Sequence, residues 1–409
     1  MNEPHLTPLR AAVAATALLC LGFAVGYGFH TSQSANRISS TRPAPKPTDT
    51  PTSTLANSAL PNSTSTPKPF APIPPTTKGL RVSPDGKRVA FTGVYGDGVR
   101  AARFVLDLQS GAVDVRETPR GWQDFVVQWN RDSRKILFDR EKIPRGVAEA
   151  TAGLHEERFE YSNDKIMAQT PRNLTPKGVL PRGEKSFSGL WTPDGELVVK
   201  TRREPKSLFQ IKNGRAVLLD RANGSYLQNR VVRENGRDVL YVVRELSNSP
   251  DSALFRVANG RARQIGETLR DVEWTYVADS ARWMIVCRTS PNSRNWLWTL
   301  YRVSSTRATR SSTRSVPGDV ISVFWSPDER AILGASGESL WTVSVPSLNT
   351  KRIGVKRDWE ADDAGWIPQQ NAVVVASRGT LWRVDVTSGQ ARALWKYPAR
   401  FWKQADKIS

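Results

Sequence analysis

The stretch VFWSPDERAILGAS, residues 323–336, decides the fold. In it Trp325 precedes a Ser-Pro-Asp turn, and an apolar run follows. Proline fixes φ and aspartate accepts hydrogen bonds from nearby backbone N–H groups, so the triplet predicts a tight turn between two short strands. Taken alone, Ser326 and Asp328 would also suit a catalytic or calcium-binding loop. Whether the stretch repeats decides between these interpretations.

The stretch does repeat. Related stretches read VSPDGKRVAF, WNRDSRKILF, WTPDGELVV, VRENGRDVLYV, YVADSARWMIV, WSPDERAILG and WIPQQNAVVV, and they begin at Val82, Trp129, Trp191, Val232, Tyr276, Trp325 and Trp366. Seven occurrences indicate a structural unit of a repeat protein rather than a single site.

A second pattern follows the first in each unit. It reads ARFVLDLQSG at Ala102, SLFQIKNG at Ser207, ALFRVANG at Ala253, TLYRVSS at Thr299, SLWTVSVPS at Ser339 and TLWRVDVTSG at Thr380, with only a weak match, ERFEYSND at Glu157, in the second unit. Its alternation of apolar and polar residues predicts strands with one buried face. Four short strands in each unit are typical of a β-propeller blade.

The units resemble the TolB-type, or WD40-like, propeller repeats, and the resemblance covers residues 79–397. The turns Ser83–Gly86, Thr192–Gly195 and Ser326–Asp328 carry it most clearly. We expect an all-β propeller of about seven four-stranded blades. Six stays open, because TolB-like propellers are usually six-bladed and residues 367–370 lack the acidic turn. The resemblance does not extend to a role like that of TolB, which has a folded domain ahead of its blades.

The N-terminal region predicts export. Residues 1–10 form a short tail, and residues 11–29 (AAVAATALLCLGFAVGYGF) carry no charge. That length suits a transmembrane signal anchor, with a cleaved secretory signal as the alternative. Residues 30–78 are rich in Pro, Thr and Ser and predict a disordered linker. We therefore expect the propeller to be anchored to a membrane on its extracytoplasmic side, followed by a tail at 398–409.

Residues typical of catalysis or metal binding are sparse. The three histidines are His5, His30 and His155, too few in the folded region to support a Ser-His-Asp triad. The nearest match to a nucleophile elbow, Gly334–Glu338, ends in Glu instead of Gly. Cys20 and Cys287 are too few for a disulfide framework or a cysteine metal site. We predict no catalytic residue, no cofactor-binding residue, no metal ligand and no cofactor.

One acidic cluster precedes Trp366. Glu360, Asp362 and Asp363 have the oxygen ligands that Ca²⁺ prefers, although a solvated loop between blades is the favoured interpretation. The tryptophans at the repeat position, Trp129, Trp191, Trp325 and Trp366, are predicted to pack between blades. Others are freer to form surface contacts: Trp122, Trp296, Trp359 and Trp402.

The net charge is +20, and most of it follows residue 78. Basic surfaces attract nucleic acid, anionic polysaccharide or anionic lipid, and export argues against nucleic acid. Scattered solvated charge is the favoured interpretation of two clusters, Arg307, Arg310 and Arg314, and Lys351, Arg352, Lys356 and Arg357. The second unit also has an insertion at 139–186, with a predicted short helix near Val147–Leu154, which is either an unstructured excursion or a recognition element.

These features favour a membrane-tethered, extracytoplasmic propeller that is not an enzyme and acts as a scaffold for an unknown protein partner of the cell envelope. Two alternatives remain open. One is a propeller hydrolase or lyase with a polar central channel. The other is a binder of anionic cell-envelope polymer, which the positive charge favours.

Overall fold

The computed structural model describes residues 73–402, apart from gaps at 96–99, 143–152, 163–164, 169–170, 176–177, 183, 185, 202–204, 248, 290–294, 317–321, 336–338, 355–358 and 360. The predicted tail 1–10, the apolar segment 11–29 and nearly all of the linker 30–78 lie outside the described residues. So does most of the predicted tail 398–409.

The described strands form six four-stranded sheets and one five-stranded sheet, each built from consecutive strands. Blade 1 contains β1 (Thr76–Val82), β2 (Arg88–Tyr95), β3 (Arg100–Asp107) and β4 (Val113–Glu117). Blade 2 contains β5 (Trp122–Trp129), β6 (Lys135–Lys142), β7 (Gly153–Ser162), β8 (Lys165–Ala168) and β9 (Arg172–Asn173). Blade 3 contains β10 (Ser186–Trp191), β11 (Leu197–Thr201), β12 (Lys206–Lys212) and β13 (Arg215–Ala222).

Blade 4 contains β14 (Tyr226–Glu234), β15 (Arg237–Glu245), β16 (Ser252–Ala258) and β17 (Arg261–Gln264). Blade 5 contains β18 (Trp274–Val277), β19 (Trp283–Thr289), β20 (Trp296–Val303) and β21 (Ala308–Val316). Blade 6 contains β22 (Ser322–Trp325), β23 (Ala331–Ala335), β24 (Leu340–Ser344) and β25 (Thr350–Ile353). Blade 7 contains β26 (Ala361–Trp366), β27 (Ala372–Ser377), β28 (Thr380–Asp385) and β29 (Ala391–Lys396), followed by the 3₁₀ helix η1 (Ala399–Phe401).

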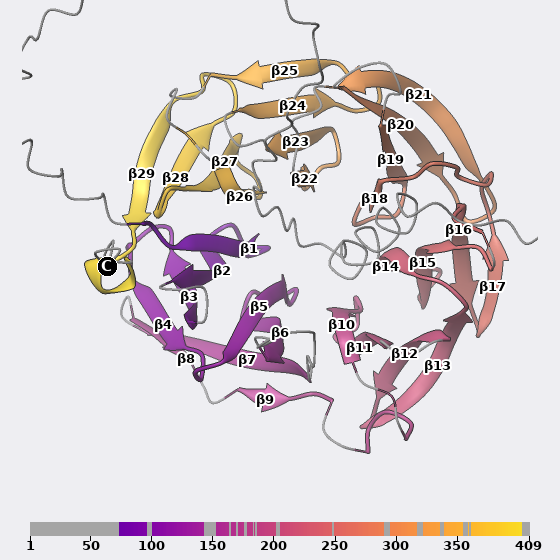
Figure 1. The fold of residues 1–409 in the computed structure, drawn as a ribbon, viewed down its shortest axis with the longest axis horizontal. Coiled ribbons are helices and arrows are strands. Elements are labelled where there is room, and N and C mark those ends of the chain that lie inside the picture. The colour runs from indigo at the N-terminus through magenta and orange to yellow at the C-terminus, as the bar shows by residue number, and fades with distance from the viewer. Residues whose placement is uncertain are drawn as a thin grey trace, which may run out of the picture.

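The sheets stand around a common centre, with the first strand of each innermost and the last at the rim (Figure 1). The predicted all-β propeller is confirmed, and each of the seven sequence units has a sheet of its own. No α-helix occurs among the residues that the structure describes.

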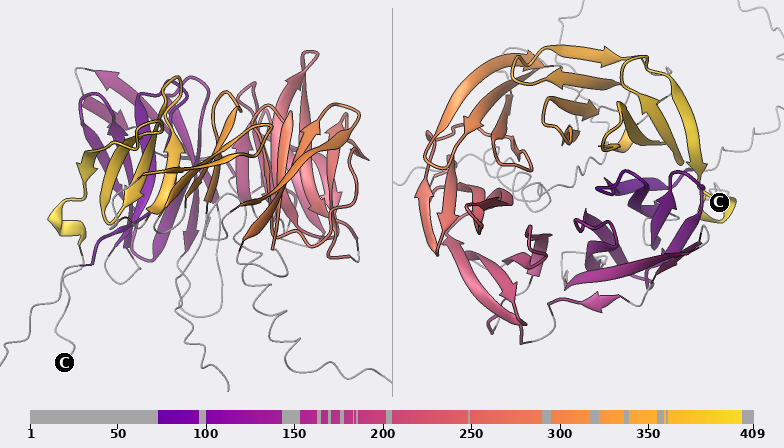
Figure 2. Two further views of the ribbon diagram at one scale, coloured as in Figure 1. Left: turned by 90° about the horizontal axis from the view of Figure 1, so that it is seen from above. Right: turned by 180° about the vertical axis from the view of Figure 1, so that it is seen from behind.

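Antiparallel pairing gives the disc two different faces (Figure 2, left). The turns that join the first strand to the second, and the third to the fourth, lie on one face, which we call the turn face. The connections between second and third strands, and between blades, lie on the other, the loop face. The Ser-Pro-Asp turns are therefore all on the turn face.

The repeated turns share one backbone geometry. In blade 1 the Gly86 N–H donates to the Ser83 carbonyl at 2.8 Å, and Gly86 has φ of +70°. Glu329 takes the same position in blade 6 with φ of +58°, where glycine would be less strained. The Ser326 hydroxyl donates to Asp328 at 2.7 Å, and Asp328 accepts the Arg330 N–H at 3.1 Å. Ser326 and Asp328 are turn residues.

The tryptophans at the repeat position pack between blades as predicted. The Trp129 indole donates to the Arg81 carbonyl of blade 1 at 2.9 Å, and the Trp366 indole donates to the Phe324 carbonyl of blade 6 at 3.0 Å. The apolar core lies between adjacent sheets, where side chains of one blade interdigitate with those of the next. Each blade is thus held mainly by its two neighbours.

The insertion at 139–186 belongs to blade 2, where it adds strands at the rim. Gly153 and Leu154, the end of the predicted short helix, lie in strand β7, so the helix prediction is wrong there; residues 147–152 lie outside the described part. Two short strands share the rim position along β7, because β8 pairs with its second half and β9 with its first half. The extra length therefore divides the fourth strand of the blade in two.

Candidate functional site

A row of basic residues crosses blade 1 on the side that faces blade 2. Lys78 on β1 is paired in register with Thr92 on β2, Thr92 with Arg103 on β3, and Arg103 with Arg116 on β4. Residues paired in this way point to the same side of a sheet. The row therefore runs from the centre of the disc to its rim, and it carries three cationic side chains.

Blade 2 presents an aspartate to this row. Asp124 on β5 is 1% exposed and forms an ion pair with Arg103, which is 3% exposed. It also accepts two hydrogen bonds from Arg140 on β6, at 2.7 and 2.9 Å. The Arg103 guanidinium stacks over the Phe138 ring at 3.7 Å from its centroid. One buried carboxylate thus orients two guanidinium groups, of which only Arg140 is partly exposed, at 25%.

Lys78 is the ionisable group of the row closest to the centre. Its side chain is half-buried, and burial lowers the pKa of Lys78 below its usual value, although the Asp362 carboxylate nearby opposes the shift. A lysine with a lowered pKa has more of the neutral amine that accepts a proton. Lys78, Arg103, Asp124 and Arg140 together form the candidate site, which we call the blade 1–2 cluster.

The blade 1–2 cluster lies near the loop face, because Lys78 and Asp124 stand near the beginning of innermost strands. The ion pairs fix the positions of Arg103, Asp124 and Arg140 relative to one another, and Lys78 lies two strands from Arg103 on the same side of blade 1. Sequence reasoning missed these four residues. The available signal was a charged residue inside an apolar strand, as in ARFVLDL for Arg103 and WQDFVVQW for Asp124.

The acidic cluster before Trp366 has a structural role. Asp363 accepts the Leu80 N–H at 2.9 Å, and Asp362 accepts the Thr77 N–H at 3.2 Å, so both hold β1 against blade 7. Burial raises the pKa of Asp363, with Arg81 and backbone donors opposing it. Glu360 lies outside the described residues. Within 73–402, allowing for the gaps given above, no three His, Cys, Asp or Glu side chains converge as metal ligands would.

The positions weighed for a catalytic triad are not brought together. His155 lies on β7 of blade 2 and the Ser326 turn follows β22 of blade 6, on opposite sides of the ring (Figure 1), and Gly334 lies in β23. Cys287 is buried, and burial raises the pKa of its thiol. In the described part of the chain, no helix is long and apolar enough to span a membrane.

The basic clusters are less scattered than expected. Arg310 and Arg314 lie on β21, Lys351 and Arg352 on β25, and Arg392 and Lys396 on β29, which are the rim strands of three consecutive blades. None of these strands contains an acidic residue, although Arg310 pairs with Glu267 at 2.8 Å, and we call the three together the basic rim. Arg307 lies in the turn before β21, whereas Lys356 and Arg357 lie outside the described residues.

The off-pattern tryptophans are packed more than the sequence suggested. Trp359 is 5% exposed and lies 5.4 Å from the Trp382 ring. Trp296 lies 4.4 Å from the Trp274 ring, and the Trp402 indole donates to the Tyr397 carbonyl at 2.9 Å. Trp122 is half-buried at the start of β5. Trp359 is therefore buried and not available for a surface contact, whereas Trp122, Trp296 and Trp402 are half-buried.

No family model matches this chain, and no curated protein matches it either. Solved structures do. The chain is similar to an oligogalacturonate lyase in complex with manganese, with 12% identity, a TM-score of 0.51, and coverage of 78% of this chain and 88% of that one. It is also similar to the β-propeller domain of the Trilobed protease from Pyrococcus furiosus, with 10% identity, a TM-score of 0.50, and coverage of 79% and 98%. At these identities the likeness shows the propeller fold alone.

A third similar structure is the periplasmic gluconolactonase of Pseudomonas aeruginosa, with 13% identity, a TM-score of 0.49, and coverage of 76% and 96%. The prediction of a non-catalytic protein scaffold, and with it the prediction that the chain is not an enzyme, is contradicted, because a propeller named as a lyase is among the similar structures. Sparse histidines do not exclude catalysis, because lysine and arginine also supply acid–base and electrostatic groups.

Proposed function

We propose that this chain is a catalytic propeller, most simply a lyase, that acts on an anionic polysaccharide of the cell envelope. The observation that carries the proposal is the blade 1–2 cluster, in which a half-buried lysine with a lowered pKa shares an interface with a guanidinium pair fixed by one buried carboxylate. The basic rim supports an anionic substrate. The similar propeller named oligogalacturonate lyase gives the class of polymer to test first.

The chemistry would be proton abstraction next to a carboxylate. Neutral Lys78 takes the proton from C5 of a uronate unit, and the electrons of that bond form a double bond to C4 as the C4–O glycosidic bond breaks. The leaving oxygen takes a proton from solvent. Arg140, the more exposed guanidinium, binds the uronate carboxylate and stabilises the charge that develops on it. Arg103 and Asp124 are positioning residues, because they are buried beneath it.

A hydrolase acting on the same polymer is the second candidate. For either the lyase or the hydrolase, we also propose a repeat type and a location. The repeats are of the TolB type, which the turn sequences support. The propeller is held outside the cytoplasm by residues 11–29, which the uncharged apolar stretch and the Pro/Thr-rich linker support. Protease treatment of intact cells stripped of any outer barrier tests the location: a propeller that stays protected until lysis contradicts it.

Incubation with polygalacturonate, alginate and hyaluronan tests the activity, with ultraviolet absorbance of the unsaturated uronate product as the readout. The Lys78→Met variant should lower the rate by about 10²-fold or more, as loss of a general base does. The matched control is Lys212→Met, which removes an exposed lysine of blade 3. Thermal unfolding of both variants shows whether a loss of rate reflects a loss of folding.

The pH profile gives a second readout. Because Lys78 acts as the neutral amine, the rate should rise with pH and level off above the pKa of Lys78, below the range of an ordinary lysine. If the wild-type protein forms neither unsaturated product nor new reducing ends from any of these polymers, the proposal is wrong. An unchanged rate in Lys78→Met, with folding intact, rejects Lys78 as the base.

A further inference from the structure

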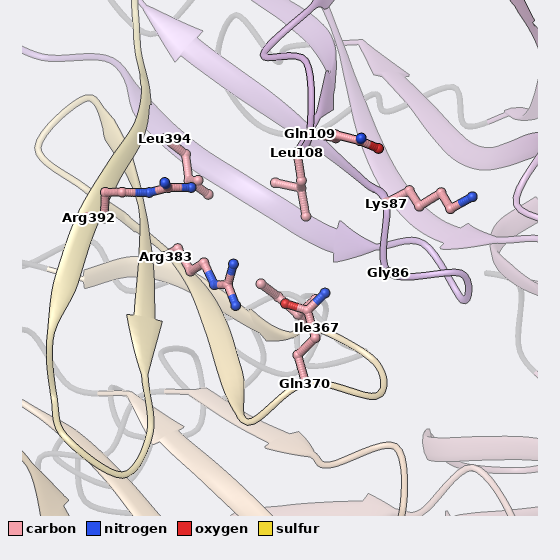
Figure 3. Close-up of a pocket in the computed structure, with 9 residues that line it drawn as sticks. All are labelled: Gly86, Lys87, Leu108, Gln109, Ile367, Gln370, Arg383, Arg392 and Leu394. Atoms are coloured by element: carbon pink, nitrogen blue, oxygen red, sulfur yellow. The ribbon is translucent and has the colours of Figure 1, made fainter.

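A cavity of about 260 Å³ lies where blade 7 meets blade 1, on the turn face of the disc (Figure 3). Its walls come from the two ends of the propeller. Blade 1 contributes the turns that hold Gly86, Lys87, Leu108 and Gln109, and blade 7 contributes the turn residues and strands that hold Ile367, Gln370, Arg383, Arg392 and Leu394. The cavity is therefore complete only when the ring is closed. We call it the seam pocket.

The polar lining of the seam pocket is cationic. Arg383 and Arg392 extend from blade 7 toward blade 1, whereas the Lys87 side chain points outward at the edge (Figure 3). Two amides, Gln109 and Gln370, accompany them, and no acidic residue is among the lining residues that the structure describes. The combination of guanidinium groups with neutral amides suits a ligand that carries one anionic group and several hydroxyls.

Two carboxylates on the same turns, Asp385 and Asp107, accept local backbone hydrogen bonds. Asp385 accepts the backbone N–H groups of Ser388 at 2.7 Å and Thr387 at 3.0 Å, and these bonds, with a smaller effect of Arg383, lower the pKa of Asp385. Asp107 accepts the N–H groups of Gln109 at 3.0 Å and Ser110 at 2.9 Å. Both carboxylates stabilise their turns through these bonds, and neither of them lines the seam pocket.

The backbone keeps the seam pocket rigid. Gly86 has φ of +70°, and a Cβ atom there would lie 3.1 Å from the Pro368 carbonyl oxygen. The absence of a side chain lets the blade 1 turn approach the blade 7 turn closely, and the two turns form one wall. Leu108, Ile367 and Leu394 supply apolar surface, against which the apolar side of a sugar ring could pack.

The volume of the seam pocket and its position beside the basic rim limit which ligands it can bind. Drug-sized ligands occupy pockets of about 300–1,000 Å³, so a cavity of about 260 Å³ suits one sugar unit at most. Arg392 belongs to the basic rim as well as to the seam pocket, so a polymer lying along β21, β25 and β29 would reach the pocket with one of its units. We propose that the seam pocket binds a single uronate unit of an anionic polysaccharide, remote from the blade 1–2 cluster on the opposite face.

The proposal takes its substrate class from the proposed function but requires no catalysis. Isothermal titration of the full chain with D-galacturonate, D-galactose and inorganic phosphate tests it. Galacturonate should bind, and galactose, which lacks the carboxylate, should bind at least about 10-fold more weakly, as expected when a charge-assisted bond is lost. The variant Arg383→Gln/Arg392→Gln should weaken galacturonate binding by about 10-fold or more.

The matched control is Arg261→Gln/Arg263→Gln, which removes two exposed arginines from β17, the rim strand of blade 4. It should leave galacturonate affinity unchanged. Equal binding of galactose, or unchanged affinity in the Arg383/Arg392 variant, overturns the proposal. Binding of phosphate without galacturonate overturns the uronate assignment. If the wild-type protein binds galacturonate but forms no product from any of the polymers, the seam pocket is supported and the proposed function is rejected.

Discussion

Two neighbouring interfaces of blade 1 are built in opposite ways. Toward blade 7, the ring closes through neutral aromatic contacts and through carboxylates that accept backbone N–H groups. Tyr397 contacts Thr77 with 3.1 Å between hydroxyl oxygens, and the Phe104 ring lies 5.1 Å from the Tyr397 ring. Toward blade 2, the interface contains the ion pairs of Asp124 with Arg103 and Arg140. One interface avoids buried cationic side chains, and the other concentrates them.

The difference indicates that one interface closes the ring and the other holds the candidate site. Because each described sheet consists of consecutive strands, no strand exchange joins the ends of the propeller, and side chains must hold blades 7 and 1 together. Dense aromatic packing does this at little electrostatic cost. Buried charges are expensive unless they are paired, and they add little to stability compared with apolar side chains of similar volume. Their presence between blades 1 and 2 is therefore better explained by function.

Removal of the Asp124 carboxylate, which Arg103 and Arg140 share, should have the largest effect on the free energy of unfolding. Asp124→Ala leaves two guanidinium groups without their buried anion, and such changes cost about 3–5 kcal/mol of unfolding free energy. Urea denaturation measures the loss. The control Asp279→Ala removes an aspartate that is 91% exposed and should change the unfolding free energy by less than about 0.5 kcal/mol. Equal stability of Asp124→Ala and wild type would contradict a buried, paired cluster.

Overpacking of the interface between blades 7 and 1 should have the second-largest effect on stability. A Cβ atom at Gly93 on β2 would lie 2.6 Å from the Tyr397 hydroxyl oxygen and 2.8 Å from Phe104 Cε2. Gly93→Ala should therefore destabilise the protein by about 1–3 kcal/mol. The matched control is Gly354→Ala, because a Cβ there meets nothing within 4 Å. If both substitutions have the same effect on the thermal midpoint, blades 7 and 1 are less tightly packed than described.

Loss of one hydrogen bond across the interface between blades 7 and 1 should lower stability less than the overpacking does. Tyr397→Phe removes the hydroxyl that contacts Thr77, at about 0.5–1.5 kcal/mol. It also removes the atom nearest to a Cβ at Gly93, so Gly93→Ala should be less costly in the Tyr397→Phe background. A double-mutant cycle by urea denaturation measures that coupling. Additive effects would show that the two positions do not contact each other.

The smallest effect should be the pH dependence of stability that arises from Asp363 at the interface between blades 7 and 1. Burial raises the pKa of Asp363 above its usual 3.8, so its folded form binds a proton more readily than its unfolded form. The stability contributed by this protonation is complete below the unfolded pKa and is lost as pH rises through the folded pKa. Relative to wild type, Asp363→Asn should be more stable near neutral pH than at acidic pH. The reverse trend in urea midpoints would reject burial as the dominant cause.

Local patterns in the sequence predicted the propeller, because turn chemistry and strand alternation are properties of a few adjacent residues. The Ser326 and Asp328 turn and the packing role of Trp129 and Trp366 followed from that local logic. One detail did not. Glu329 replaces a turn glycine, and its carboxylate accepts the Ser280 N–H at 2.7 Å from the neighbouring blade. The turn pattern predicts only a turn residue at position 329, whereas the structure shows a contact between blades.

The candidate sites could not be found in the same way. Strand register places Lys78 and Arg103 on the same side of blade 1, two strands apart, and Asp124 of the next sheet pairs with Arg103. Gly86 and Arg392 line one pocket although they lie at opposite ends of the propeller sequence. The rim arginines seemed scattered along separate hairpins, and only the ring arrangement places β21, β25 and β29 on consecutive blades.

The sequence by itself determined the repeat, the turn and strand order within a blade, and the positive charge, since each depends on composition or on residues close in the chain. The tertiary structure decided how the ring closes, which charges are buried and which cations share a surface. Those properties depend on sheet register and on contacts between blades, where residues tens to hundreds of positions apart meet. A single sequence carries no local signal for such contacts.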